Sequence, residues 1–269
     1  MKKYIIKNHQ FLEEKQAQIS IHERGFLFGD GIFETCKIFN GKIYDYAAHH
    51  ARIDMALQQL KIIAEISNLE KKSLQLIKKN NIKNGLLRIS ISRGIGSSGY
   101  LPTYNSKPLI IIETLEERAL PKKITLGISK ICAPKIPFKS MNSLPYIMNK
   151  MEAVEEKFFD LVMLCDKNFI AETSSANIFW IKKGEVFTPH HSCNIVLGCI
   201  RKKLLEIPEL KIKTVKARPS ALKNADEIFL TNSAFLALPV DEFMGRKLQK
   251  NFGKKIQKLL ATDLKNSCR

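Results

Sequence analysis

The sequence predicts a mixed α+β protein of two domains. Strand-like and helical segments alternate along its 269 residues, and 45% of the residues are apolar, which is enough for a large buried core. A charged stretch that contains a proline, EERALPKK at 116–123, interrupts the strand pattern. We therefore expect a domain at 1–116, a linker at 117–122 and a second domain at 123–269.

In the first half, residue patterns predict four strands and one helix. Apolar residues at helical spacing indicate a helix over 46–62. Alternation of apolar and polar residues over 86–92 predicts a half-buried strand, and the continuous apolar run at 108–114 predicts a buried one. Short apolar runs predict two further strands, at 3–7 and 17–21.

Strands and helices alternate again in the second half, which contains no internal repeat or low-complexity segment. The segments predicted as strands, some separated by turns, are 124–130, 161–166, 170–189, 226–233 and 236–240. The segments predicted as helices are 146–159, 200–206 and 253–264.

The charge balance is strongly basic, with 44 Lys and Arg against 26 Asp and Glu and a net charge of +18. The basic residues form scattered pairs and one triplet at 201–203, a pattern typical of a solvated surface rather than a nucleic-acid-binding tract. A positive field also favours capture of a small anionic substrate. We expect such a substrate, and no nucleic-acid partner.

The six cysteines form no CxxC pair, so we expect neither a metal site nor a disulfide framework. The N-terminal apolar stretch is too short for a signal peptide, and no apolar window is long enough to span a membrane. We therefore expect a cytoplasmic location and no membrane association.

A glycine-punctuated stretch, RGFLFGDGIFE at 24–34, stands out in the first half. Its spacing fits neither a dinucleotide-binding fingerprint nor a Walker loop. Taken alone, it predicts a tight turn between two strands.

Two residues of the second half have complementary chemistry. Lys139 lies among apolar and small polar residues, where a lysine can form a Schiff base with a carbonyl cofactor. Glu172, in IAETSSANIFW, could face the nitrogen of a pyridine ring and keep it protonated. A Lys and a Glu at this separation are also commonplace surface residues, so spacing alone does not establish the pair.

Three further segments offer donors to an anion. Arg52 lies on the predicted helix that contains His49, and a guanidinium can bind a phosphate through two hydrogen bonds. The amides of Cys199 and Ile200 follow a glycine at a helix start. Asn232 and Ser233 add polar groups at the end of a predicted strand, in the segment LTNS.

The order of these motifs resembles the fold-type IV family of pyridoxal 5′-phosphate (PLP) enzymes. The family includes branched-chain aminotransferases, D-amino acid aminotransferases and 4-amino-4-deoxychorismate lyases. The resemblance covers roughly residues 18–240 and implies a small N-terminal α/β domain, a larger C-terminal domain with a barrel-like sheet, and a homodimer. Its motifs are FGDGIFET, HxxR at 49–52, Lys139 with Asn142, AETSSANIFW, VLGCIR and FLTNS.

The resemblance also implies a role for each matching residue. Lys139 matches the lysine that holds PLP and shuttles a proton, and Glu172 matches the partner of the ring nitrogen. Lys135 and Lys150 lack the asparagine three residues later and the family's spacing to the glutamate. The residues that match the phosphate-binding site are Arg52, Cys199, Ile200, Asn232 and Ser233.

One segment favours a particular branch of the family. SRGIGSSGYLP at 92–102 resembles the SRGxGxxGYxP stretch of the lyases, whereas D-amino acid aminotransferases tend to have an Arg-x-His pair here. Lyases often have Arg where this chain has Ser98, so a donor for a substrate carboxylate is missing. We expect Arg93, Tyr100 and Thr35 to contact substrate, although Tyr100 could instead hold a loop.

The resemblance implies cleavage of 4-amino-4-deoxychorismate to 4-aminobenzoate and pyruvate, a step in folate biosynthesis. Lys139 would remove the proton from the carbon that bears the amine, and Lys139 or Thr35 would protonate the leaving group. Transamination of D-amino or branched-chain amino acids stays open, because it begins with removal of the same proton. A basic nucleic-acid-binding protein that merely inherits the fold is the alternative from another class.

Overall fold

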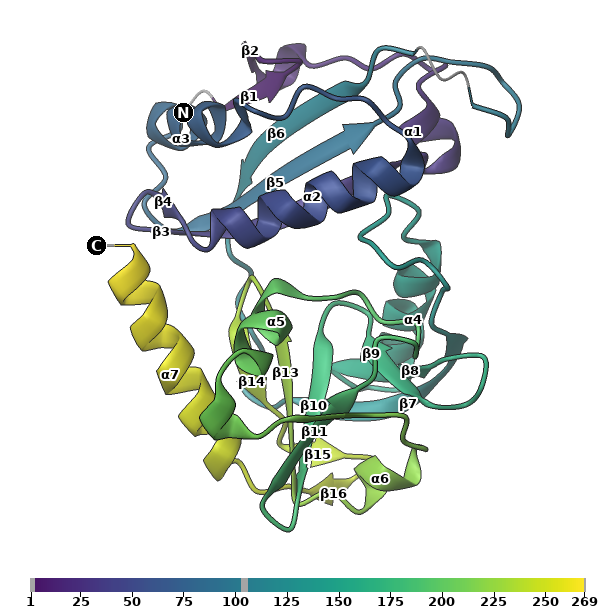
Figure 1. The fold of residues 1–269 in the computed structure, drawn as a ribbon, viewed down its shortest axis with the longest axis vertical. Helices are drawn as coiled ribbons and strands as arrows, with labels where there is room; N and C mark the ends of the chain where they lie inside the picture. Colours follow the sequence, from purple (N-terminus) through teal and green to yellow (C-terminus); the bar gives the residue numbers. More distant parts are fainter. Residues whose placement is uncertain (1–2, 103–105, 269) are drawn as a thin grey trace. The chain divides into compact units, whose positions relative to one another are not determined.

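The computed structural model describes residues 3–102 and 106–268, which form two compact units (Figure 1). The chain leaves the first unit after Arg118, inside the segment predicted as a linker. Two segments predicted in the C-terminal domain group with the first unit instead, and one of them contains Lys139. The first unit consists of Met1–Arg118, Phe138–Asn142 and Leu264–Arg269, and the second of Ala119–Pro137 and Ser143–Asp263.

The first unit is built on an antiparallel sheet with the strand order β2-β1-β6-β5-β3-β4. Its strands are β1 (Tyr4–Lys7), β2 (Gln10–Glu13), β3 (Gly31–Phe39), β4 (Lys42–Ile43), β5 (Gly85–Ser92) and β6 (Leu109–Leu115). Its helices are α1 (Arg24–Phe28), α2 (Tyr46–Leu60), α3 (Leu69–Lys79) and a 3-10 turn at Glu14–Gln16.

Helices α2 and α3 lie against the sheet of the first unit (Figure 1). Ile53 of α2 and Leu76 of α3 share a buried cluster with Cys36 of β3, Ile89 of β5 and Ile112 of β6. Side chains alternate between the two faces of a strand, so the neighbours of these residues point to the other face. That second face is less buried and carries the polar groups of the candidate site.

The second unit is built on a ten-stranded mixed sheet. Its strand path is β12-β11-β10-β9-β8-β7-β15-β16, and β13 joins it by pairing with β10 and β14. The strands are β7 (Thr125–Cys132), β8 (Asp160–Leu164), β9 (Ile170–Thr173), β10 (Asn177–Lys182), β11 (Glu185–Pro189), β12 (Lys213–Val215), β13 (Glu227–Asn232), β14 (Leu236–Pro239), β15 (Glu242–Phe243) and β16 (Arg246–Lys247).

The second unit also contains helices, of which α4 and α7 are the longest. They are α4 (Leu144–Glu155), α5 (Cys199–Leu205), a 3-10 turn at Pro208–Leu210, α6 (Ser220–Lys223) and α7 (Asn251–Ser267). Inside the unit, the rings of Phe179 and Phe229 stack with their centres 4.8 Å apart.

Both units combine a sheet with helices, so the mixed α+β class predicted from the sequence is confirmed.

Three local predictions were wrong. Residues 17–21 form no strand, and Ile19 and Ile21 are exposed instead of covering a core. The stretch 24–34 is a short helix that turns into β3, rather than a turn between two strands. The apolar run at 108–114 is a strand, but alternate residues are only partly buried because helices cover one face of the sheet.

A buried charge cluster joins α2 to β3. Glu34 of β3 accepts hydrogen bonds from two nitrogens of Arg52, with Nε 2.8 Å from Oε2, and His49 Nδ1 lies 3.1 Å from Oε1. Glu34 and His49 are each 1% exposed. Burial raises the pKa of Glu34, but the charge of Arg52 and hydrogen bonds from His49 and Arg52 outweigh burial and hold that pKa far below its ordinary value of 4.5.

We predict that Glu34→Gln lowers the free energy of unfolding by about 3 kcal/mol at pH 7, because it leaves the largely buried Arg52, whose side chain is 10% exposed, without its carboxylate. A carboxyl whose pKa is lowered by folding stabilises the protein above its unfolded pKa and loses that effect as pH falls. The difference between variant and wild type should therefore shrink steadily below about pH 4.5. Urea unfolding of both proteins between pH 3 and pH 7 measures this difference in the free energy of unfolding.

The control is Glu14→Gln, which breaks an ion pair with Lys3 on the surface, where Glu14 is 45% exposed. Its effect should stay below about 0.5 kcal/mol at every pH. A constant difference between wild type and Glu34→Gln across the pH range would contradict the prediction.

Candidate functional site

The segment that carries Lys139 pairs with the start of β3. Phe33 N donates to Lys139 O at 3.0 Å, and Met141 N donates to Gly31 O at 3.0 Å. A β-bridge between Ile32 and the residue after Lys139 lies between these bonds. The position of Lys139 is therefore fixed by backbone hydrogen bonds.

Glycines make this pairing possible. Gly29 ends α1 with φ +66°, and a Cβ there would lie 2.8 Å from Asn142 N. A Cβ at Gly31 would lie 2.7 Å from Met141 Sδ of the same segment and 2.6 Å from Ile91 O of β5. Any larger residue at either position would push the backbone of its neighbour away. The glycine-rich stretch thus admits the segment that carries Lys139, a function that its sequence did not reveal.

Three polar side chains lie on the same face of the first unit's sheet. Lys139 Nζ is 4.3 Å from the ring centre of Phe33, and Arg88 Cζ is 5.6 Å from the same centre. Thr35 is two residues beyond Phe33 on β3 and pairs with Arg88 of β5. An amine, a hydroxyl and a guanidinium therefore cluster around Phe33.

Arg88 was missed by the sequence reasoning. It occupies a polar position of the alternating strand at 86–92, where solvent exposure is the ordinary expectation. Within the part of the chain that the structure describes, its Nε atom is buried and has no hydrogen-bond partner. A buried guanidinium nitrogen in this state is suited to bind an anion.

Arg93, predicted to contact substrate, is held by other groups of the protein. Its Nε and Nη2 donate to Asp30 at 2.8 and 3.0 Å, and Nη2 also donates to Leu60 O at 2.8 Å. The residue is only 5% exposed. These contacts join β5 to the end of α2, so they give Arg93 a structural role, and its substrate contact stays a prediction.

Tyr100 lies on a loop that Arg24 holds. Arg24 donates to Asp30 Oδ2 at 2.8 Å and to Gly99 O at 2.7 Å. The Tyr100 side chain is 89% exposed, and its ring meets the ring of Phe28 edge-on at 5.7 Å. The loop position is thus fixed, and Tyr100 faces solvent in the described chain; its contact with substrate stays a prediction.

In the second unit, Glu172 on β9 is almost fully buried, at 3% exposure. Its Oε1 accepts from the hydroxyl of Tyr146 at 3.0 Å. Its Oε2 accepts from Asn177 Nδ2 and from Val196 N, each at 3.0 Å. Hydrogen bonds from these donors stabilise the ionised carboxylate.

Asn177 connects Glu172 to the start of α5. Besides Glu172, its Nδ2 donates to Val196 O at 2.8 Å. A Cβ at Gly198 would lie 2.1 Å from Asn177 Oδ1, so this position has no room for a side chain. Gly198 caps α5, whose first residues are Cys199 and Ile200, and their side chains are buried.

Asn177 also pairs with Glu172 on one side and with Thr231 of β13 on the other. Side chains of directly paired residues lie on the same face of a sheet, so Glu172, Asn177 and Thr231 form a row. Thr231 Oγ1 is buried and has no hydrogen-bond partner among the described residues. Thr231 was not among the predicted site residues, although it lies in the quoted LTNS segment.

The side chain of Asn232 forms hydrogen bonds with nearby backbone groups. Its Nδ2 donates to Ser175 O at 3.1 Å, and its Oδ1 accepts from the backbone of Ala234 and Phe235 at 2.9 and 3.0 Å. The side chain therefore stabilises the turn after β13. Ser233, the next residue, is partly buried in that turn. Roles of both in phosphate binding stay predictions.

The competing lysines lie elsewhere in the second unit. Lys135 forms an ion pair with Asp166 at 2.8 Å, and its side chain is 70% exposed. Lys150 lies 4.0 Å from the buried Asp160 and its amine contacts Phe159 O. Neither lies on β9, β10 or β13, where the row of polar side chains is found.

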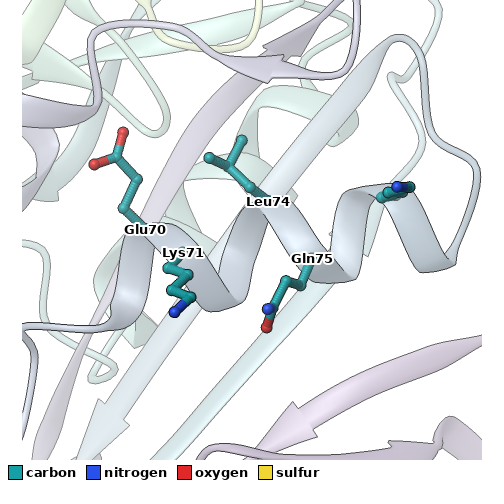
Figure 2. Close-up of a pocket in the computed structure, with 5 residues that line it drawn as sticks. Glu70, Lys71, Leu74 and Gln75 are labelled. Atoms are coloured by element: carbon teal, nitrogen blue, oxygen red, sulfur yellow. The ribbon is translucent and has the colours of Figure 1, made fainter.

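A surface concavity lies on α3 of the first unit. Figure 2 shows Glu70, Lys71, Leu74 and Gln75 projecting from successive turns of this helix, and Lys78 completes the lining. All five residues belong to one helix, and none was predicted to take part in chemistry.

Within the described ranges, no helix is long and apolar enough to cross a lipid bilayer. Three or more His, Cys, Asp or Glu side chains do not gather into a metal-binding group there. The six cysteines are free thiols.

Sequence relatives include enzymes of several activities. An aminodeoxychorismate lyase of Bacillus subtilis is 30% identical over 245 residues, which cover 86% of this chain and 84% of the lyase. A D-alanine aminotransferase of Bacillus licheniformis is 26% identical, with 98% of this chain and 96% of that enzyme covered.

Solved structures share the fold. The branched-chain amino acid aminotransferase of Escherichia coli has a TM-score of 0.91 at 20% identity, covering 100% of this chain and 97% of that one. The 4-amino-4-deoxychorismate lyase of Pseudomonas aeruginosa has a TM-score of 0.85 at 23% identity, covering 97% and 99%. The profile described as "Amino-transferase class IV" matches residues 31–243. The chain therefore belongs to the class IV aminotransferase family of PLP-dependent enzymes.

Proposed function

We propose that this protein cleaves 4-amino-4-deoxychorismate to 4-aminobenzoate and pyruvate, with PLP held by the predicted residues. The observation that carries the proposal is the cluster of Lys139, Thr35 and Arg88 around Phe33. The cluster combines a base, a hydroxyl that can donate a proton, and a cation for a carboxylate. The substrate, a dicarboxylate with an amine, needs all three.

The second unit supports the cofactor assignment. The hydroxyl of buried Thr231, which has no hydrogen-bond partner among the described residues, fits a polar group bound against the row of Glu172, Asn177 and Thr231. Close packing of Gly198 on Asn177 fixes the start of α5 beside that row. Thr231, with the amides of Cys199 and Ile200 and with Asn232 and Ser233 nearby in sequence, would serve the phosphate. Glu172, in the same row, would accept from the ring nitrogen and keep it protonated.

In the first unit, Glu34 fixes the orientation of Arg52. Two nitrogens of the Arg52 guanidinium donate to the two oxygens of the Glu34 carboxylate. This paired contact holds the guanidinium in one orientation. We propose that the same guanidinium also binds the phosphate. Glu34 would then act by positioning Arg52, without touching the cofactor itself.

The cofactor, once bound, supplies an electron sink that acidifies the proton on the amine-bearing carbon. Lys139 removes that proton, and the bond between the ring carbon and the enolpyruvyl oxygen breaks. Thr35 or the protonated Lys139 donates a proton to the leaving group, which becomes pyruvate, while the ring becomes aromatic. Arg88 binds one carboxylate and supplies the donor that Ser98 does not.

Transamination is the alternative, and the D-alanine and branched-chain aminotransferases among the relatives favour it. Lys139 and Glu172 would serve both reactions, because each begins with removal of the same proton. Thr35 and Arg88 are the residues that would favour cleavage over transfer.

We also propose that the protein acts as a homodimer in the cytoplasm. Five apolar side chains on α4 are 46–68% exposed in the described chain. They lie at the spacing of one helical face, and an apolar stripe of this kind is typical of a contact with another protein. A second copy of the chain is the occupant we propose for the α4 stripe, formed by Leu144, Ile147, Met148, Met151 and Val154.

The first test is release of pyruvate and 4-aminobenzoate from 4-amino-4-deoxychorismate with no keto acid added. We expect the two products in equal amounts, and a loss of about 10³-fold or more in Lys139→Ala, because the base is gone. Lys135→Ala, which removes an exposed lysine, is the control and should keep full activity.

Failure of wild-type protein to release pyruvate would overturn the lyase proposal. Conversion of D-alanine or L-leucine with 2-oxoglutarate would then identify the aminotransferase branch. Borohydride treatment should attach PLP covalently to Lys139 in either case, which tests the cofactor separately.

Arg88→Met should raise KM for the dicarboxylate about tenfold or more, because one charge-assisted hydrogen bond is lost. The kcat should change much less, since Arg88 takes no part in proton transfer. The control is Arg118→Met, which removes an exposed guanidinium. An unchanged KM would exclude Arg88 from substrate binding.

Light scattering tests the dimer. Wild-type protein should have the mass of two 30.7 kDa chains, and Met151→Glu should shift it toward one chain because the charge lies within the α4 stripe. Glu155→Lys, at the exposed end of the same helix, should leave the mass unchanged. A monomeric wild type would contradict the assignment.

A further inference from the structure

The carboxylate of Glu172 is held by donors from separate parts of the second unit. Tyr146 lies on α4, Asn177 on β10, and Val196 in the loop before α5. Asn177 and Val196 both bind Oε2, and they also bind each other. The donor at Oε1 is the hydroxyl of Tyr146. Asn177 and Val196 lie within the motifs AETSSANIFW and VLGCIR, whereas Tyr146 lies outside every motif found in the sequence.

The Tyr146 side chain is fixed in place by apolar contacts. Its ring packs against a buried cluster that includes Met163, Ala171 and Ile195. Ala171 precedes Glu172 on β9, so the same strand that carries the carboxylate also supports the ring. Removing the hydroxyl alone would leave this packing in place.

The hydroxyl is a neutral donor. Burial, the negative charge of Glu172 and the hydrogen bond to it raise the pKa of Tyr146 far above its ordinary value of 10.0. The buried Arg201, which is bound to Pro189 O at 2.8 Å, also interacts electrostatically with Glu172. A phenol that stays protonated beside a carboxylate must donate to it.

We propose that Tyr146 is a positioning residue for the cofactor: its hydroxyl fixes Oε1 of Glu172 and helps keep that carboxylate ionised toward the ring nitrogen. The inference rests on the proposed function, in which Glu172 accepts from that nitrogen. Tyr146 would act through Glu172 and would not itself touch the reacting atoms.

The chemical consequence follows from proton affinity. A carboxylate that accepts hydrogen bonds is a weaker base than one that does not. Glu172 would therefore leave the proton on the ring nitrogen, where it favours withdrawal of electrons from the reacting carbon. Without the Tyr146 hydroxyl, the Glu172 carboxylate would be more basic and less firmly oriented. It would then draw the proton away from the ring nitrogen more strongly.

Tyr146→Phe tests the inference on the purified enzyme. The dissociation constant of PLP, measured by absorbance titration of the cofactor-free protein, should rise about tenfold for the loss of one hydrogen bond to a charged group. The visible absorption spectrum of the bound cofactor should shift, and kcat should fall while KM for substrate stays nearly constant.

The matched control is Tyr46→Phe. The Tyr46 hydroxyl is buried in the first unit and has no hydrogen-bond partner among the described residues, so its loss breaks no bond. This variant should keep wild-type affinity, spectrum and kcat. Thermal unfolding of both cofactor-free variants reports any general loss of stability.

Each outcome bears on a different claim. If wild-type protein binds no PLP, the proposed function fails. If wild type binds PLP and Tyr146→Phe has the same affinity and spectrum, only the role of Tyr146 is overturned. If Tyr146→Phe lowers thermal stability but leaves the spectrum and the ratio of kcat to KM unchanged, Tyr146 is structural, and the inference is again overturned.

Discussion

Pairing between β3 and the segment at 138–142 is the constraint on which the first unit's site depends. The backbone bonds between Phe33 and Lys139 and between Gly31 and Met141 need close approach, and glycine provides the space. The register of these bonds decides which side chains meet Lys139. A shift by one residue would replace Phe33 beside the amine with a residue that faces the core.

Buried charge is handled differently in the two units. In the first, Glu34 and Asp30 are each bound by arginines, so opposite charges are paired directly where solvent is largely excluded. In the second, Glu172 accepts hydrogen bonds from three neutral donors: Tyr146, Asn177 and Val196. A carboxylate stabilised by neutral donors keeps more of its negative potential than one bound directly by a guanidinium, as the proposed role of Glu172 requires.

The order of motifs along the sequence predicted the fold class and the candidate residues that lie within those motifs. Short motifs can be recognised because turns and helix starts require particular residues, such as glycine. It did not reveal Arg88 or Tyr146, whose significance arises from strand register and from packing between distant segments. Nor did it show that Arg93 and Asn232 are held by backbone carbonyls and amides. A side chain's type is visible in the sequence, but its partners are not.

The alternation of β3 separates two functions along one strand. Residues whose side chains face the helices include Glu34, which fixes Arg52. Those that face the other way include Phe33 and Thr35, beside Lys139 and Arg88. A substitution on the second face can therefore alter the polar cluster around Phe33 without disturbing the Glu34 carboxylate that holds Arg52. Because successive side chains of a strand point to opposite faces, one strand carries both a structural ion pair and the cluster on which the proposed activity rests.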